Sequence, residues 1–356
     1  MLVQMKYIKN KKVNLSEDSF NKLSEKLEKN IRAFGENSYS LKEAASHHFK
    51  MGGKRTRAKL FFNAIDSSIS ENLLVSVASS VELIHEASLI HDDVNDTDNF
   101  RRGQETIWKK FGSNTAILLG DHLISSAFKV IVESKLDDKL KVSFVSILSD
   151  AIITAASGQH SQLNINHSSA NINEDYEKIA KSKTGAILAI PLQFSVILNS
   201  EKKFLDDIQD DLIKTAIKCG EYLGLAYQIM NDLNPYKNLK SIKDDSDLSS
   251  KIITAPIIAT KKLYPNKNPF SVALSDQVKI NKILNFCYIW LENCLQLCIE
   301  ESEKLPENID SAIKNFINDY FIEKIDADFI NIKKNQKNSK IKSKINRINK
   351  TQEVLV

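Results

Sequence analysis

Glycine and proline are scarce in this chain, with 10 and 6 among 356 residues. Glycine inside an element costs backbone entropy, and proline removes a hydrogen-bond donor and clashes with the preceding helical turn. Their scarcity, together with long stretches in which apolar residues recur at helical spacing, predicts an all-α protein. The length of 356 residues, 42% of them hydrophobic, allows one large core or two smaller ones.

Cysteine is also rare, and its pattern excludes two classes of protein. The cysteines have no histidine nearby and form no Cys-x-x-Cys pair, so neither a zinc site nor a disulfide scaffold is indicated. We interpret them as buried thiols on helix faces: Cys219, Cys287, Cys294 and Cys298. No uninterrupted apolar run approaches the ~20 residues of a membrane span. The basic segment Met1–Lys12 lacks an apolar signal core, so we expect a cytoplasmic protein.

Acidic residues are missing near the carboxyl end. Residues 333–350 hold eight lysines and arginines, and removing them changes the net charge from +4 to −4. Such a run is typical of a solvated tail, so we predict one helical domain over residues 1–330 and a disordered tail over residues 331–356. The tail allows at most weak contact with an anionic membrane surface. Aromatic residues do not interleave with its charges, which argues against nucleic-acid binding.

Three aspartates cluster at the end of a predicted helix: Asp92, Asp93 and Asp96. Asp92 and Asp96 lie one helical turn apart, on the same face. Two such carboxylates repel each other unless a cation lies between them, and hard oxygen ligands select Mg²⁺ or Mn²⁺. Arg101 and Arg102 follow, and arginine suits phosphate oxygens. Taken alone, the run is more simply a solvated acidic helix end.

A second cluster of charge precedes a helix predicted from Ala58. Gly52 and Gly53 give a permissive backbone there. Lys54 and Arg57 are three residues apart, so both project from the first turn, where backbone amides also face outward. This arrangement predicts an anion-binding site, although a Gly-Gly pair before a basic helix start is often only a turn.

In their order and spacing, these motifs resemble the trans-isoprenyl diphosphate synthases of the polyprenyl synthetase family. The resemblance covers about residues 40–260 and adds single residues that would mean little alone: His85, Lys183, Thr184, Gln228 and Lys251. It implies an all-α, isoprenoid synthase-type helical bundle around a central apolar cavity, usually as a homodimer. It also implies an Mg²⁺-dependent prenyltransferase that ionises an allylic diphosphate and condenses it with isopentenyl diphosphate.

The resemblance also assigns roles to residues. Mg²⁺ would be bound by Asp92 and Asp96, with Asp93 in support. The allylic diphosphate would be held by Arg101, Lys183, Thr184, Gln228 and Lys251. Isopentenyl diphosphate would be held by Lys54, Arg57, His85 and Arg102. The apolar cavity would be formed by helix faces around Leu83, Ile84 and Leu118. The product would grow past the small residues Ala87 and Ser88, so we expect it to be longer than C15.

The second aspartate-rich motif of the family is degenerate here. Asn231, Asp232 and Pro235 occupy the positions that carry aspartate in the family. Pro235 should end the helix, because its ring clashes with the carbonyl four residues earlier. Asp232 remains as a candidate metal ligand, and Asp244, Asp245 or Asp247 could supply another oxygen by folding back.

Because of this departure, two other hypotheses stay open. Asn231 in the first position resembles the Asn/Ser/Glu motif of class I terpene synthases, and the degenerate motif resembles isoprenyltransferases that modify quorum-sensing peptides. The same ionisation would then serve cyclisation or prenylation of a peptide. A catalytically idle subunit of a heteromeric synthase is less favoured, because it has no need of three clustered carboxylates.

Overall fold

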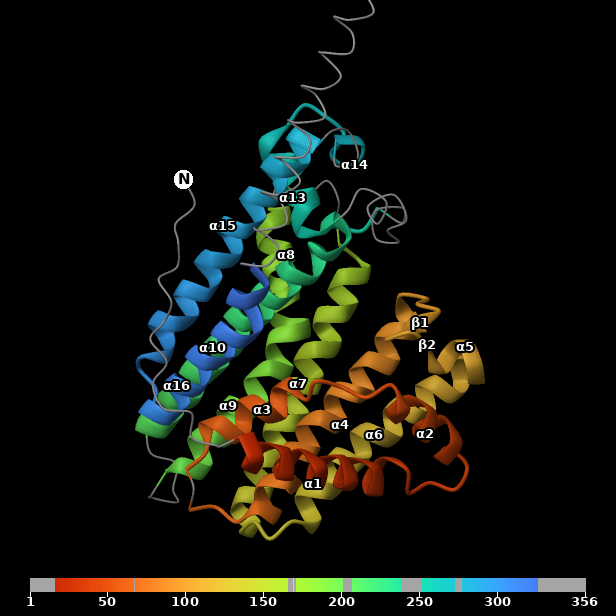
Figure 1. Ribbon diagram of the computed structural model, residues 1–356, viewed down its shortest axis with the longest axis vertical. Coiled ribbons are helices and arrows are strands. Elements are labelled where there is room, and N and C mark those ends of the chain that lie inside the picture. Colours follow the sequence, from red (N-terminus) through yellow and green to blue (C-terminus); the bar gives the residue numbers. More distant parts are fainter. Residues whose placement is uncertain are drawn as a thin grey trace, which may run out of the picture.

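Helices account for nearly all the secondary structure in the computed structural model (Figure 1), as the sequence predicted. The structure describes residues 17–66, 68–165, 169, 171–200, 207–237, 251–272 and 277–325. The predicted tail, the segment Met1–Lys12 and the three aspartates between 243 and 248 lie outside these residues.

The elements are distributed over two halves of the chain. The amino-terminal half contains α1 (Glu17–Gly35), α2 (Lys42–Lys50), α3 (Thr56–Ala64), α4 (Glu71–Asn95), β1 (Phe100–Arg101), β2 (Gln104–Glu105), α5 (Ile107–Phe111), α6 (Ser113–Glu133) and α7 (Asp138–Leu163). The other half contains α8 (Ile172–Ala180), the π-helix η1 (Lys181–Gly185), α9 (Ala186–Asn199), α10 (Asp207–Asp232), the 3₁₀-helix η2 (Asn234–Lys237), α13 (Ala255–Leu263), α14 (Pro269–Val272), α15 (Gln277–Ser302), α16 (Glu307–Ile317) and the π-helix η3 (Asn318–Ile322).

Two apolar cores hold these helices together. One is built from α1, α3, α4, α6, α7 and α9, and the other from α10, α13, α15 and α16. Helices α3 and α9 contribute to both, with Leu60 and Leu188 in one core and Phe61 and Ile190 in the other. The cysteines are all buried and unpaired, as predicted, and lie in the α10–α15 core.

The connection between α4 and α5 contains a short antiparallel hairpin. Phe100 pairs with Glu105 and Arg101 with Gln104. The two residues of its turn, Arg102 and Gly103, both have positive φ angles of 51° and 80°, as the right-handed twist of a two-residue hairpin requires. The hairpin directs Arg101 back towards the end of α4.

The helical stretch formed by α8 and α9 is interrupted by η1, which carries Lys183 and Thr184. A π-turn adds a residue to the helical repeat, and such turns often occur at functional sites. The expected break at Pro235 is confirmed, because α10 ends at Asp232.

Three helices are long and apolar enough to cross a membrane by length and composition, namely α4, α6 and α7. The sequence search for uninterrupted apolar runs overlooked them, because small polar residues such as serine interrupt each one. In the fold, 72% of the apolar window of α4 is buried, against only 17% for α7. Helix α4 is therefore a core helix, whereas α7 keeps most of its apolar length at the surface.

Candidate active site

A cavity of about 640 Å³ lies between α4, α6, α7, η1 with α9, and α10. We call it the donor pocket. Its polar lining includes Asp92, Asp96, Arg101, Lys183, Thr184, Gln228 and Asn231. Its apolar lining includes Ile84, Leu89, Ile124, Ile152, Ala155, Ala156, Leu163 and Ile187. Most of the residues predicted to hold the allylic diphosphate and the metal therefore meet in one cavity.

Asp92 and Asp96 face the donor pocket from the last turn of α4. The Lys183 ammonium lies 3.4 Å from Asp92 Oδ1 and donates to Gln162 Oε1 at 3.2 Å. Burial raises the pKa of Asp96, with a further upward contribution from Asp92, while Lys183 opposes the shift. The two carboxylates thus share one electronegative site that a cation would stabilise.

The carboxylate ligand set suits Mg²⁺ or Mn²⁺ rather than zinc. In the part of the chain that the structure describes, no group of three or more His, Cys, Asp or Glu side chains is placed to hold a metal. Mg²⁺ commonly uses one or two carboxylates and completes its shell with water and substrate phosphate. The pair Asp92 and Asp96 fits that pattern. Asp121 of α6 also lines the donor pocket and was not singled out from the sequence.

Asp93 has a different role from its neighbours. It is buried and accepts a 2.7 Å hydrogen bond from Arg101 Nε, and Arg101 Nη2 lies 2.5 Å from the same oxygen. Burial raises the pKa of Asp93, and the Arg101 guanidinium opposes this shift. Asp93 therefore holds Arg101, which lines the donor pocket, whereas its predicted support of a metal ion stays a prediction.

A second cavity of about 210 Å³ adjoins the first, and we call it the basic pocket. Its lining includes all the residues predicted to hold isopentenyl diphosphate: Lys54, Arg57, His85 and Arg102. Arg57, His85 and Tyr227 line both cavities, so the two pockets meet at these side chains. Burial lowers the pKa of His85, and so does the Arg57 charge, which keeps the imidazole neutral.

Gly53 eases the packing of the basic pocket. A Cβ at this position would lie 3.1 Å from Arg55 Nη1 and 3.2 Å from Arg102 Nη1. The absent side chain leaves room for both guanidinium groups.

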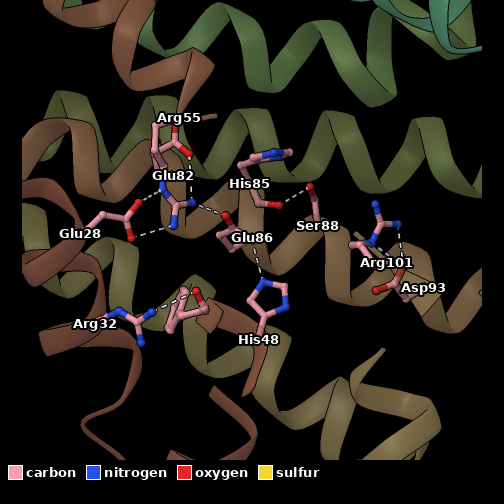
Figure 2. A network of polar contacts seen from close by, with 11 residues as sticks. Glu28, Arg32, His48, Arg55, Glu82, His85, Glu86, Ser88, Asp93 and Arg101 are labelled. Atoms are coloured by element: carbon pink, nitrogen blue, oxygen red, sulfur yellow. Dashed lines mark hydrogen bonds and ion pairs between the residues drawn. The ribbon is translucent and has the colours of Figure 1, made fainter. Parts of the chain in front are cut away.

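A polar network, drawn in Figure 2, extends from the wall of the basic pocket, which Arg55, Glu82 and Glu86 line, into the protein. Arg55 pairs with Glu28 and Glu86, and Glu82 Oε2 lies 3.5 Å from Arg55 Nη1. His48 Nε2 is 2.7 Å from Glu86 Oε2. Burial alone would raise the pKa of Glu86, but the hydrogen bond with His48 and the charges of His48 and Arg55 outweigh it and lower the pKa. The network fixes the turn that carries Lys54 and Arg57, and sequence reasoning missed it because its members lie far apart in the chain.

Glycines allow three helical segments to approach closely beside the donor pocket. A Cβ on Gly158 of α7 would lie 2.6 Å from the Lys183 backbone nitrogen, and one on Gly224 of α10 would lie 2.3 Å from that of Gly185. These close approaches bring η1 against both α7 and α10. As a result Lys183 reaches Asp92 across the donor pocket.

The degenerate second motif turns its carboxylate away from the donor pocket. Asp232 is buried, and its oxygens accept hydrogen bonds from Tyr176 Oη at 2.7 Å, Ala255 N at 2.8 Å and Gln228 Nε2 at 2.9 Å. A carboxylate with these partners does not fit the predicted role of metal ligand. Asn231 lines the donor pocket in its place.

Lys251 is exposed, has a φ angle of 58° and does not line either pocket. Its predicted contact with diphosphate stays a prediction.

The residues expected around the growing product separate into three groups. Ser88 and Ile84 line the donor pocket. Ala87 and Leu83 are buried in the core instead, and Leu118 is 58% exposed. The expectation that Ala87, Leu83 and Leu118 form the cavity wall is therefore wrong. These residues of α4 and α6 lie on other faces of their helices than those that line the pocket.

Comparison with known proteins agrees with this geometry. The polyprenyl synthetase family profile matches residues 38–285. The chain is 29% identical to geranylgeranyl diphosphate synthase of Saccharolobus solfataricus over 265 residues, which cover 73% of this chain and 76% of that protein. It is 30% identical to farnesyl diphosphate synthase of Micrococcus luteus over 271 residues, covering 72% of this chain and 88% of the relative.

Solved structures share the same fold. Geranylgeranyl pyrophosphate synthetase from the archaeon Geoglobus acetivorans has a TM-score of 0.70 at 23% identity, covering 85% of this chain and 99% of the other. The chain therefore belongs to the polyprenyl synthetase family and is a trans-isoprenyl diphosphate synthase, a prenyltransferase with an all-α fold.

Proposed function

We propose that this enzyme catalyses an Mg²⁺-dependent condensation of an allylic diphosphate with isopentenyl diphosphate. The observation that carries the proposal is the pair of adjoining pockets. The donor pocket combines Asp92, Asp96 and Arg101 with an apolar extension, and the basic pocket holds Lys54 and Arg102 within reach of it. One allylic and one non-allylic diphosphate would then meet at Arg57, His85 and Tyr227.

The protein would lower the barrier mainly by electrostatics. Arg101 and Lys183 face the position of the leaving diphosphate, where negative charge develops as the C–O bond breaks. Mg²⁺ held between Asp92 and Asp96 would add Lewis-acid stabilisation of the same charge. The apolar lining around Ile152 excludes water from the allylic cation. No protein nucleophile is required.

Two observations bear on the acceptor and the product. The basic pocket contains all the side chains expected to hold isopentenyl diphosphate, which favours chain elongation. Ser88, on the apolar path one turn before Asp92, is small, which favours a product longer than C15. The named relatives include farnesyl, geranylgeranyl and octaprenyl diphosphate synthases, so similarity alone selects no length.

The α10 side of the donor pocket supports an alternative fate of the allylic cation, cyclisation or transfer to a peptide. There Asn231 presents a neutral amide and Asp232 is turned away. Cyclisation or prenylation of a peptide would place less demand on a second cation site than repeated condensation.

The proposal includes a homodimer that buries the outer faces of α6 and α7. Exposed apolar side chains gather there: Ile117, Leu118, Val132, Val142, Ile153 and Leu163. Ile117 and Leu163 also line the donor pocket, so a second copy of the chain would close its outer wall. Light scattering after gel filtration should give twice the chain mass, and Ile153→Glu should give monomers.

We also propose a cytoplasmic location, which suits four free, buried cysteines.

The test of function is an incubation of purified enzyme and Mg²⁺ with C5 to C20 allylic diphosphates, with and without isopentenyl diphosphate. Mass spectrometry should show prenyl diphosphates lengthened in C5 steps, and only when isopentenyl diphosphate is present. Hydrocarbons from an allylic diphosphate alone would instead establish the cyclisation alternative.

A further inference from the structure

Gln159 of α7 is a buried amide without partners in the wall of the donor pocket. Both its Nε2 and its Oε1 are shielded from water and make no hydrogen bond. It is the only side chain in the described parts of the chain with two such orphaned polar atoms. A buried polar group that lacks a partner costs stability, so its presence calls for an explanation beyond packing.

The position of Gln159 along α7 relates it to both ends of the pocket. One turn earlier lie Ala155 and Ala156, which belong to the apolar lining. One turn later lies Gln162, which accepts a hydrogen bond from Lys183, whose ammonium faces Asp92. Gln159 therefore lies at the border between the diphosphate end and the apolar end. On the proposed function, carbon C1 of the allylic substrate occupies this border.

The carboxamide suits a position beside a carbocation. Its oxygen carries partial negative charge, so it stabilises a developing cation when the pocket excludes water. The released pyrophosphate is a much stronger base than this amide, so the proton lost after bond formation passes to pyrophosphate. A carboxylate in the same place would form an ion pair with Lys183 and could capture the cation as an ester.

We propose that Gln159 is a catalytic residue that turns its amide oxygen towards the allylic C1–C3 unit as it ionises. The C1–O bond breaks and its electron pair leaves with pyrophosphate. The alkene of isopentenyl diphosphate then forms the new bond to C1, and a proton passes from its C2 to the released pyrophosphate. Gln159 is unchanged throughout, because it contributes only its dipole.

The variant that tests this role is Gln159→Leu, with Gln193→Leu as its matched control. Gln193 is a buried glutamine on α9 that does not line either pocket. Gln159→Leu should lower the rate of allylic diphosphate ionisation by about 10- to 100-fold, measured in single turnovers with and without isopentenyl diphosphate. Affinity for a non-ionisable allylic thiolodiphosphate, measured by calorimetry, should change by less than about threefold, because the diphosphate contacts remain. The melting temperature should not fall, because an unpaired amide is replaced by an apolar group.

Three results would overturn the role. One is an unchanged ionisation rate in Gln159→Leu, and another is an equal loss in Gln193→Leu. The third is a loss of thiolodiphosphate affinity that matches the loss of rate, which would make Gln159 a binding residue only. Failure of the proposed function is separate, since it would show as absence of turnover in the wild-type enzyme with every allylic diphosphate.

Discussion

A single methyl group added at Gly224 should disable the active site without unfolding the protein. In Gly224→Ala the new Cβ would lie 2.3 Å from Gly185 N, 2.4 Å from Gly185 Cα and 3.0 Å from Thr184 C. All three are backbone atoms, so no side chain can rotate out of the way. Ordinary contact begins near 3.4 Å, and α10 and η1 must therefore separate by roughly 1 Å.

This separation acts directly on the groups proposed to hold the allylic diphosphate. Thr184 and Lys183 lie in η1 at the contact, and Gln228 lies one turn beyond Gly224. A misplacement of about 1 Å can cost on the order of 100-fold in rate. Overpacking costs about 1–3 kcal/mol, and alanine returns about 1 kcal/mol of helix propensity. The free energy of unfolding should therefore fall by only about 0–2 kcal/mol.

Gly220→Ala is the matched control on the same helix. Its Cβ would lie 2.5 Å from the Ala189 Cβ, a contact of similar tightness outside both pockets. Steady-state kcat at saturating substrates and urea unfolding should show similar stability losses for the two variants but a large loss of kcat only for Gly224→Ala. Equal losses of kcat in both, or full activity in a folded Gly224→Ala, would refute the reasoning.

Three further outcomes are expected. Asp92→Ala and Asp96→Ala should each lower turnover by at least about 1000-fold, because a lost ligand removes several kcal/mol of transition-state stabilisation; full wild-type turnover in excess chelator would contradict this. Ser88→Phe should shorten the product seen by mass spectrometry, whereas Ala87→Phe should chiefly lower the melting temperature, since Ala87 lies in the core. Because folding lowers the pKa of Glu86, its carboxylate contributes its full stabilisation to the fold at pH values above its ordinary pKa of 4.5. This stabilisation is lost as the pH falls through the pKa of Glu86 in the folded protein. Glu86→Gln should therefore cost about 2 kcal/mol of unfolding free energy at pH 7 and progressively less below pH 4.5 in urea titrations.

Sequence reasoning predicted the parts of the fold that depend on local pattern. The 3.6-residue repeat and the aspartates at its end identified α4, and Pro235 identified the end of α10. It missed η1, because a π-turn depends on packing against Gly158 and Gly224 from other helices. The hairpin after α4 was missed as well, since its two strands are only two residues long.

The sequence also failed to identify side chains whose role depends on residues far away in the chain. Arg55 stands beside Lys54 in a recognisable motif, but its partners Glu28 and Glu86 carry no signal in the sequence. Gln159 was visible only as part of a polar stretch at the end of α7. Its orphaned amide could be found only once the pocket wall was known.

Asp232 shows why a matching residue type does not establish a matching role. Its carboxylate joins α8, α10 and the start of α13 through Tyr176, Gln228 and Ala255, so its charge serves the fold. Its neighbour Asn231 faces the donor pocket but offers a neutral amide. Among the described residues, the acidic lining of the donor pocket comes from α4 and from Asp121 of α6, and α10 supplies none of it. A cation bound near α10 would therefore depend on substrate phosphates for its counter-charge, which ties its affinity to the presence of substrate.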